Sequence, residues 1–298
     1  MKAIGVDLGG HKIAVGLVED GRITARTEER TEPTREPEPV VAQIVRMAKA
    51  FGAGAPMGVC IPGGLDATRE RALMISNFAG WNGLPIRRMF ESVLGAPVVV
   101  ENDANAYALG ERLAGVARGM SDYIVITLGT GIGGGIVSGG RLLTGAHGMA
   151  GEVGHIVLGS DEPCGPGCGG LGHFEAMCGA DALEKRALKI GCSDADISLK
   201  DLWARREEEK ISPLWDFALE TISRGIASLV HVFDPEAVII GGGMRNGEGF
   251  MENLGERVPK YLGLPFREGF RLLSSSLGTD APIFGGAAVV SAAIENRA

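Results

Sequence analysis

Tyr123-Ile-Val-Ile-Thr-Leu-Gly-Thr-Gly-Ile-Gly-Gly-Gly-Ile-Val137 is an apolar run that a glycine-rich segment interrupts and that then resumes. This pattern predicts a strand, a loop and a second strand, and Ser138-Gly-Gly-Arg141 adds a tight turn before a third strand. The N-terminus has the same order, with an apolar run over 3–7, the pair Gly9-Gly10, a second apolar run and the turn Glu19-Asp-Gly-Arg22. We therefore predict that one supersecondary unit occurs twice, which indicates a duplicated α/β domain.

The composition is that of a folded protein without a basic surface. The chain has 298 residues, of which 45% are hydrophobic and 22% charged, and its formal net charge is −8. These values exclude a disordered chain, and the negative charge argues against a nucleic-acid partner. No apolar window approaches the length of about 18 residues that suggests a membrane span, and the first apolar stretch is too short for a signal peptide. We expect a cytoplasmic protein, away from membranes, whose five cysteines are reduced.

Helical periodicity lies between and after the two predicted strand units. Apolar residues follow helical spacing over 41–51, 105–116, 180–190 and 214–233, and residues 287–295 form an alanine-rich helix. The proline-rich residues 32–39 are expected to form a loop. We expect a small N-terminal domain, residues 1–117 with the C-terminal helix 286–298, and a larger domain over 118–285.

Three glycine loops each follow an apolar strand, at Gly9-Gly10, at Gly129–Gly135 and at Gly241–Gly243. Backbone N–H groups in such loops form anion sites, and phosphate is their usual ligand. One such loop only marks the end of a strand, but three in a duplicated scaffold favour a nucleotide site. The Walker sequence G-x-x-x-x-G-K-[ST] is absent. Residues 129–134 match G-x-G-x-x-G, but a strand and not a helix follows, so we reject a dinucleotide-binding fold.

Five motifs, in this order along the chain, resemble those of the sugar kinases of the repressor/ORF/kinase (ROK) family. They are Asp7-Leu-Gly-Gly-His-Lys12, Glu101-Asn-Asp-Ala-Asn105, Leu128-Gly-Thr-Gly-Ile-Gly-Gly-Gly135, Gly151-Glu-Val-Gly-His155 and Cys168-Gly-Gly-Leu-Gly-His-Phe-Glu175. The resemblance covers essentially the whole chain. It implies an actin-like, hexokinase-type fold, with two α/β domains around a cleft for ATP and sugar.

The same resemblance implies an ATP- and Mg²⁺-dependent hexose kinase that phosphorylates the 6-hydroxyl of an aldohexose, with glucose as the first candidate. Fructose, mannose, N-acetylglucosamine and N-acetylmannosamine are the alternative substrates. A sugar-responsive repressor on the same scaffold would need an N-terminal helix-turn-helix domain, and the first predicted strand begins at residue 3. We therefore expect an enzyme whose partners are a hexose and ATP, and the family analogy implies a homodimer or homotetramer.

Asp103 is the candidate catalytic base. It lies between the predicted strand Pro97–Glu101 and the helix that begins near Asn105, where an aspartate also serves as an ordinary helix cap. The resemblance assigns it the role of deprotonating the sugar hydroxyl. By the same resemblance, the residues that bind the sugar hydroxyls are Gly64, Asn77, Asn102, Glu152, His155 and Glu175, together with Asp103.

The resemblance also indicates where ATP binds. Asp7 would position Mg²⁺ or its waters, and Lys12 either neutralises a phosphate or is a solvated surface lysine. His11 stands where the family usually has threonine and is able to donate to a phosphate. The nucleotide-binding candidates are Asp7, Gly9, Gly10, His11, Lys12, Gly129, Thr130, Gly131, Gly133, Gly241, Gly242 and Gly243.

A candidate zinc site lies between residues 155 and 173. His155, Cys164, Cys168 and His173 supply two nitrogen and two sulfur ligands within 19 residues, a set that suits tetrahedral Zn²⁺. The family usually has a C-x-C pair and a third cysteine, whereas this chain has Cys164-x3-Cys168 and His173. A metal-free loop packed by small residues is the alternative.

Overall fold

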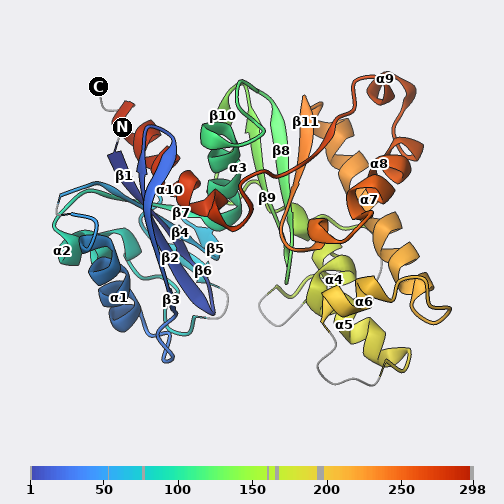
Figure 1. Ribbon diagram of the computed structural model, residues 1–298, viewed down its shortest axis with the longest axis horizontal. Helices are drawn as coiled ribbons and strands as arrows, with labels where there is room; N and C mark the ends of the chain where they lie inside the picture. The colour runs from blue at the N-terminus through green and yellow to red at the C-terminus, as the bar shows by residue number, and fades with distance from the viewer. Residues whose placement is uncertain are drawn as a thin grey trace. The chain divides into compact units, whose positions relative to one another are not determined.

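The computed structural model describes residues 2–52, 54–75, 78–159, 161–164, 168–192 and 198–295. The chain folds into two compact units, each with its own sheet (Figure 1). Unit 1 comprises residues 1–120, 141–151 and 276–298, and unit 2 comprises residues 121–140 and 152–275. The domain boundaries placed after residues 117 and 285 stay predictions.

The sheet of unit 1 has the strand order β3-β2-β1-β4-β7. Its strands are β1 (Lys2–Leu8), β2 (Lys12–Glu19), β3 (Arg22–Arg30), β4 (Met57–Ile61) and β7 (Val98–Asn102). β1, β2 and β3 form the predicted antiparallel meander, and β4 and β7 run parallel to β1. The register places Asp7, Cys60 and Glu101 beside one another across the three parallel strands. The carboxyl ends of these strands therefore bring Asp7 and Asp103 to one edge of the sheet.

Helices cover both faces of this sheet (Figure 1). Helices α1 (Pro37–Lys49) and α2 (Ile86–Leu94) share a buried core with the even-numbered residues of β1, while α10 (Ala281–Glu295) packs on the other face beside Ala3. Helix α3 (Asp103–Ala114) packs against α10, and a hairpin of β5 (Gly63–Leu65) and β6 (Ala72–Ile75) follows β4. Helix α1 begins inside the stretch predicted as a loop, because proline is well tolerated in the first helical turn.

Close packing of α10 explains part of the glycine excess. A Cβ at Gly5 would overlap the carbonyl of Ile283, and a Cβ at Gly58 would overlap the carbonyl of Gly286. Only glycine lets the helix approach β1 and β4 this closely.

Unit 2 repeats the topology of unit 1. Its strands β8 (Tyr123–Leu128), β9 (Ile132–Ser138), β11 (Ala237–Gly241) and β12 (Leu272–Ser274) have the order β9-β8-β11-β12, which matches β2-β1-β4-β7. The two-residue strand β10 (Arg141–Leu142) lies at the boundary between the units. Both hairpin turns have positive φ at their central residues, 50° and 74° at Asp20-Gly21 and 56° and 74° at Gly139-Gly140. The predicted duplication is therefore confirmed.

The helices of unit 2 surround one large apolar core, which contains residues of β8, β9 and β11. They are α4 (Phe174–Cys178), α5 (Ala180–Lys189), α6 (Leu199–Ala204), α7 (Ser212–Phe233), α8 (Phe250–Arg257) and α9 (Leu264–Arg267). The helices predicted over 105–116, 180–190, 214–233 and 287–295 are confirmed as α3, α5, α7 and α10. Within the described ranges, none of the helices combines the length and hydrophobicity needed to cross a membrane.

Candidate active site

The corner between β7 and α3 in unit 1 holds the candidate base. The side chain of Asn102 caps α3, because its Oδ1 accepts a hydrogen bond from the Asn105 backbone N–H at 3.0 Å. Its Nδ2 donates to the carbonyl of Gly63 and to Oδ1 of Asp103, both at 3.1 Å. The Ala104 N–H donates to the same Asp103 oxygen at 2.8 Å. The capping role thus belongs to Asn102, and two donors on one oxygen orient the half-buried Asp103 carboxylate.

Asp7 carries a second carboxylate at the end of β1. Burial, together with the negative charge of Asp103, raises its pKa from 3.8 to about 7, although the positive charge of Lys12 lowers it. Asp7 and Asp103 are therefore close enough to repel each other, and Lys12 offsets this negative charge only in part. Carboxylate oxygens are the ligands that Mg²⁺ prefers, so the donor set fits that cation.

The loop Gly9–His11 joins β1 to β2, and it is held by Thr31, to which no motif assigned a role. Thr31 donates from Oγ1 to the carbonyl of Gly9 at 2.7 Å and from its backbone N–H to the carbonyl of His11 at 3.0 Å. His11 and Lys12 are exposed, and the ammonium of Lys12 pairs with Glu28 at 3.1 Å. The structure thus shows Lys12 in a surface ion pair, and its role toward a phosphate stays a prediction.

The other two glycine loops meet in unit 2. The loop after β8 is Gly129–Gly131, shorter than the predicted Gly129–Gly135, because β9 begins at Ile132 and Gly133 pairs with Thr127. Gly241 ends β11, and Gly242 and Gly243 follow it; β8 and β11 are parallel neighbours. Gly242 has φ +79°, and a Cβ on it would overlap the carbonyl of Leu128. Gly129 closes its own loop by donating to the carbonyl of Gly131 at 3.0 Å. The duplicated fold therefore brings the glycine loops, including Thr130, to one edge of this sheet, as phosphate binding requires.

Three predicted sugar ligands gather beside these loops in unit 2. Glu175, in the first turn of α4, accepts a hydrogen bond from the Ile132 N–H at 2.7 Å, and a Cβ on Gly131 would collide with its carboxylate. Burial raises the pKa of Glu152, the positive form of His155 opposes this, and the charge of Glu175 raises it further. Nε2 of His155 lies 3.8 Å from Oε2 of Glu152. Glu152, His155 and Glu175 thus form one polar cluster next to the β8 loop.

The four predicted zinc ligands converge in the same unit. Their ligand atoms all lie within 4.8 Å of one another. The separations are 3.0 Å between the Nδ1 atoms of His155 and His173, 3.5 Å and 3.2 Å from Cys168 Sγ to these two nitrogens, and 3.8 Å from Cys164 Sγ to His155 Nδ1. Tetrahedral zinc with bonds of about 2.0–2.3 Å places its ligand atoms about 3.3–3.8 Å apart. Two of the four separations fall in this range and the other two are shorter by at most about 0.3 Å, so the donor set suits Zn²⁺ and the four side chains converge closely enough to share one ion.

Gly64, a further predicted sugar contact in unit 1, lies beneath Met149, which belongs to none of the sequence motifs. A Cβ on Gly64 would lie 2.5 Å from Sδ of Met149, so the thioether fills the space over this glycine. Asn77 lies outside the described residues.

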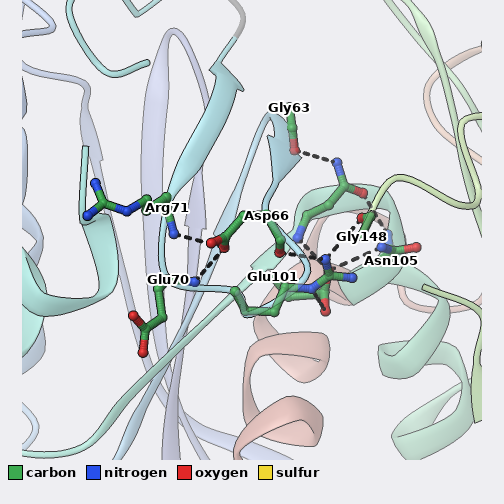
Figure 2. A network of polar contacts seen from close by, with 9 residues as sticks. Gly63, Asp66, Glu70, Arg71, Glu101, Asn105 and Gly148 are labelled. Atoms are coloured by element: carbon green, nitrogen blue, oxygen red, sulfur yellow. Dashed lines mark hydrogen bonds and ion pairs between the residues drawn. The ribbon is translucent and has the colours of Figure 1, made fainter. Parts of the chain in front are cut away.

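Arg69 and Glu101 are two further residues without a predicted role, and they lie in the polar network of Figure 2. Glu101 stands inside the quoted motif 101–105 and was detectable there. No pattern in the sequence distinguishes Arg69.

Comparison with known proteins gives the family. A family model described as "ROK family" matches residues 3–293, nearly the whole chain. The chain belongs to the ROK family. It is 35% identical over 311 residues to a glucokinase of Thermotoga maritima, with 97% of each chain covered. Among ROK relatives with another name is an N-acetylmannosamine kinase of Escherichia coli, 31% identical, with 84% of this chain and 86% of that protein covered.

Solved ROK structures confirm the predicted fold. A ROK hexokinase from Thermus thermophilus matches with a TM-score of 0.85 at 34% identity, covering 99% of this chain and 100% of that one. A ROK glucokinase from Streptomyces griseus, in complex with glucose and AMPPNP, matches with a TM-score of 0.83 at 32% identity, covering 97% and 99%. The chain therefore has the actin-like, hexokinase-type fold of two α/β units that the ROK resemblance implied.

Proposed function

We propose that this protein is an ATP- and Mg²⁺-dependent hexose kinase that phosphorylates the 6-hydroxyl of an aldohexose, with glucose as its preferred sugar. Membership of the ROK family and the similarity to proteins named glucokinase support the transfer of phosphate to a sugar. The observation that carries the proposal is the Asp103 carboxylate, which Asn102 and the Ala104 N–H orient beside Asp7.

In the proposed reaction Asp103 accepts the proton of the 6-hydroxyl while the sugar oxygen attacks the γ-phosphorus of ATP. The bond between that phosphorus and the β–γ bridging oxygen breaks, and ADP leaves with the electron pair. A positioned general base contributes about 10²–10⁴-fold to such a step. Alignment of the sugar oxygen with the γ-phosphate contributes up to about 7–11 kcal/mol, so residues that hold the sugar matter more than the base alone. We assign the sugar hydroxyls to Gly64, Asn77, Asn102, Glu152, His155 and Glu175.

The phosphates of ATP are assigned to the three glycine loops. The β1–β2 loop with His11 and the adjoining Lys12, and the neighbouring segments Gly129–Gly133 and Gly241–Gly243, would supply backbone N–H groups for anions. Asp7 is the carboxylate that would hold Mg²⁺, directly or through water. When bound, Mg²⁺ neutralises charge on the phosphate oxygens.

The choice of sugar is the finest part of the proposal. Similarity to glucokinases favours glucose, whereas the E. coli relative favours N-acetylmannosamine. The sugars differ at carbon 2, where one bears a hydroxyl and the other an acetamido group. A coupled assay of ADP release with glucose, mannose, fructose, N-acetylglucosamine and N-acetylmannosamine tests the assignment. If kcat/KM is highest with glucose, the assignment is supported. If it is higher with either N-acetyl sugar, that sugar is the preferred substrate instead.

We further propose that His155, Cys164, Cys168 and His173 bind one structural Zn²⁺. Four protein ligands leave no open position for water or substrate, which is typical of structural zinc. Because Nδ1 of His155 faces the other ligands, its Nε2 faces Glu152 and is available to a sugar hydroxyl. The metal would thereby orient a sugar ligand. Removing it should weaken sugar binding more than nucleotide binding.

By family analogy we also propose a cytoplasmic homodimer or homotetramer. Sedimentation velocity of the purified protein distinguishes these states from a monomer of 31.1 kDa.

A further inference from the structure

A buried ion pair between Arg69 and Glu101 lies at the β7–α3 corner of unit 1, which also carries the candidate base. Nε of Arg69 donates to Oε2 of Glu101 at 3.0 Å, and the two side chains are only 14% and 7% exposed. Removing two charges from water costs free energy that their attraction regains only in part, so a buried pair is weak evidence for a stabilising role. Glu101 lies two residues before Asp103, so the pair is placed to influence the position of the candidate base.

The Glu101 carboxylate holds the corner that carries Asp103. Its Oε1 accepts hydrogen bonds from the backbone N–H of Asn102 at 2.9 Å and from Nδ2 of Asn105 at 3.1 Å (Figure 2). Asn102 and Asn105 flank Asp103, and the Asn102 side chain contacts the Asp103 carboxylate directly. A shift of Glu101 therefore reaches the base through one intervening residue.

Arg69 joins this corner to a second segment of unit 1. Its Nη1 donates to the carbonyl of Gly148 at 3.0 Å and to that of Asp66 at 3.3 Å (Figure 2). The fit is close, because a Cβ on Gly148 would lie 2.6 Å from that nitrogen. Gly148 precedes Met149, which covers Gly64, and lies four residues before Glu152 in the sequence.

Arg69 is held in this place at a cost. Its φ is +58°, the left-handed region that side chains other than glycine adopt with strain of about 1 kcal/mol or more. Asp66 braces the turn, since its Oδ1 accepts from the backbone N–H groups of Glu70 and Arg71 at 2.8 Å and 3.0 Å. Among the described residues, buried Nη2 of Arg69 and Oδ1 of Asn105 have no hydrogen-bond partner. Strain and unsatisfied buried atoms both destabilise the folded chain, so stability alone does not explain this network.

We infer that Arg69 is a positioning residue for phosphoryl transfer, which aligns Asp103 through Glu101 and Asn102 and fixes the segment around Gly148 and Met149 against Gly64. The inference rests on the proposed kinase function. The planar guanidinium is suited to this role because it donates to a carboxylate and to carbonyl oxygens in fixed directions at once.

The test compares Arg69→Met in two backgrounds, with steady-state ADP release measured well below each variant's melting temperature. In the wild-type background we expect kcat to fall about tenfold or more while the KM for ATP stays within about twofold. In the Asp103→Asn background the same change should lower kcat by less than about threefold, because residues that act through one group are not additive. Arg69→Lys keeps the positive charge but lacks the planar guanidinium, and we expect its kcat to lie between those of Arg69→Met and wild type.

Arg87→Met is the matched control. Arg87 forms a partly buried ion pair with Glu91 at 3.2 Å in the same unit, so its loss reports the general cost of removing such a pair. We expect its kcat to stay within about twofold of wild type. The inference is overturned if Arg69→Met keeps wild-type kcat, if it loses the same factor in both backgrounds, or if Arg87→Met loses as much. If Asp103→Asn is inactive but Arg69→Met keeps wild-type activity, only this inference is refuted. If the wild type is inactive on every hexose, the proposed function is refuted too.

Discussion

Replacing Asp7 by asparagine should make the ligand-free protein more stable at neutral and alkaline pH. Burial, together with the charge of Asp103, raises the pKa of Asp7 from 3.8 to about 7. The folded chain thus holds this proton more tightly than the unfolded chain does. The resulting stabilisation is complete below pH 3.8 and is lost as the pH rises through 7.

The size of the effect follows from the two pKa values. The full difference corresponds to about 4 kcal/mol of unfolding free energy, of which about 2–3 kcal/mol is lost between pH 5 and pH 8. Asparagine carries no charge, so Asp7→Asn avoids this loss. We expect the stability advantage of Asp7→Asn over wild type to grow by about 2–3 kcal/mol across this interval. The same variant should lose kinase activity, because it removes the proposed Mg²⁺ carboxylate.

Urea unfolding without nucleotide or Mg²⁺, followed by tryptophan fluorescence, measures this advantage. The chain has three tryptophans, and Trp81 in unit 1 is fully buried, whereas Trp203 and Trp215 lie in unit 2. Comparing both proteins in a Trp203→Phe/Trp215→Phe background therefore reports unit 1.

Glu29→Gln is the control of opposite sign. Hydrogen bonds from Arg46 and Gln43 lower the pKa of Glu29, so its stabilising contribution is present near neutral pH and is lost in acid. If the stability advantage of Asp7→Asn is absent at pH 8, or does not grow from pH 5 to pH 8, the raised pKa of the buried Asp7 carboxylate is refuted.

Three further changes probe the site. Asp103→Asn should lower kcat by about 10² or more with a much smaller change in the KM for sugar; turnover within about threefold of wild type would exclude Asp103 as the base. Gly242→Ala should raise the KM for ATP and lower stability, because its Cβ would overlap Leu128, whereas Gly255→Ala on α8 faces open space and should do neither. Elemental analysis should find one zinc per chain, and Cys168→Ser should lower both the zinc content and the affinity for sugar. A fully active wild type with well under half a zinc per chain would show that the loop is metal-free.

Local patterns predicted the part of the fold that local physics decides. The alternation of apolar runs with glycine loops located β1–β2–β3 and β8–β9, because strands and tight turns depend on neighbouring residues. The start of β9 was placed too late, since residues 132–135 belong to the strand and not to the predicted loop. The start of α1 at Pro37 was missed, since proline is tolerated in a first helical turn as well as in a loop.

Contacts between distant segments could not be predicted. Gly5 and Gly58 are required by α10, more than 200 residues later, and nothing near them indicates that helix. Within the site, the motif around Asn102 and Asp103 was recognisable, but its partner Arg69 is 32 residues from Glu101 and lies in an unremarkable turn. Pairings of this kind depend on how β5 and β7 are placed side by side, which one sequence does not reveal.

ADP release with glucose and with 6-deoxyglucose, measured for wild type and Asp103→Asn, tests the proposed reaction most directly. The two sugars differ only in the hydroxyl that is proposed to attack the γ-phosphate. We expect rapid ATP-dependent turnover of glucose by wild type, a rate lower by about 10² or more in Asp103→Asn, and no sugar-dependent ADP release with 6-deoxyglucose. Equal turnover of both sugars, or no hexose-dependent ADP release by wild type, would contradict phosphorylation of the 6-hydroxyl.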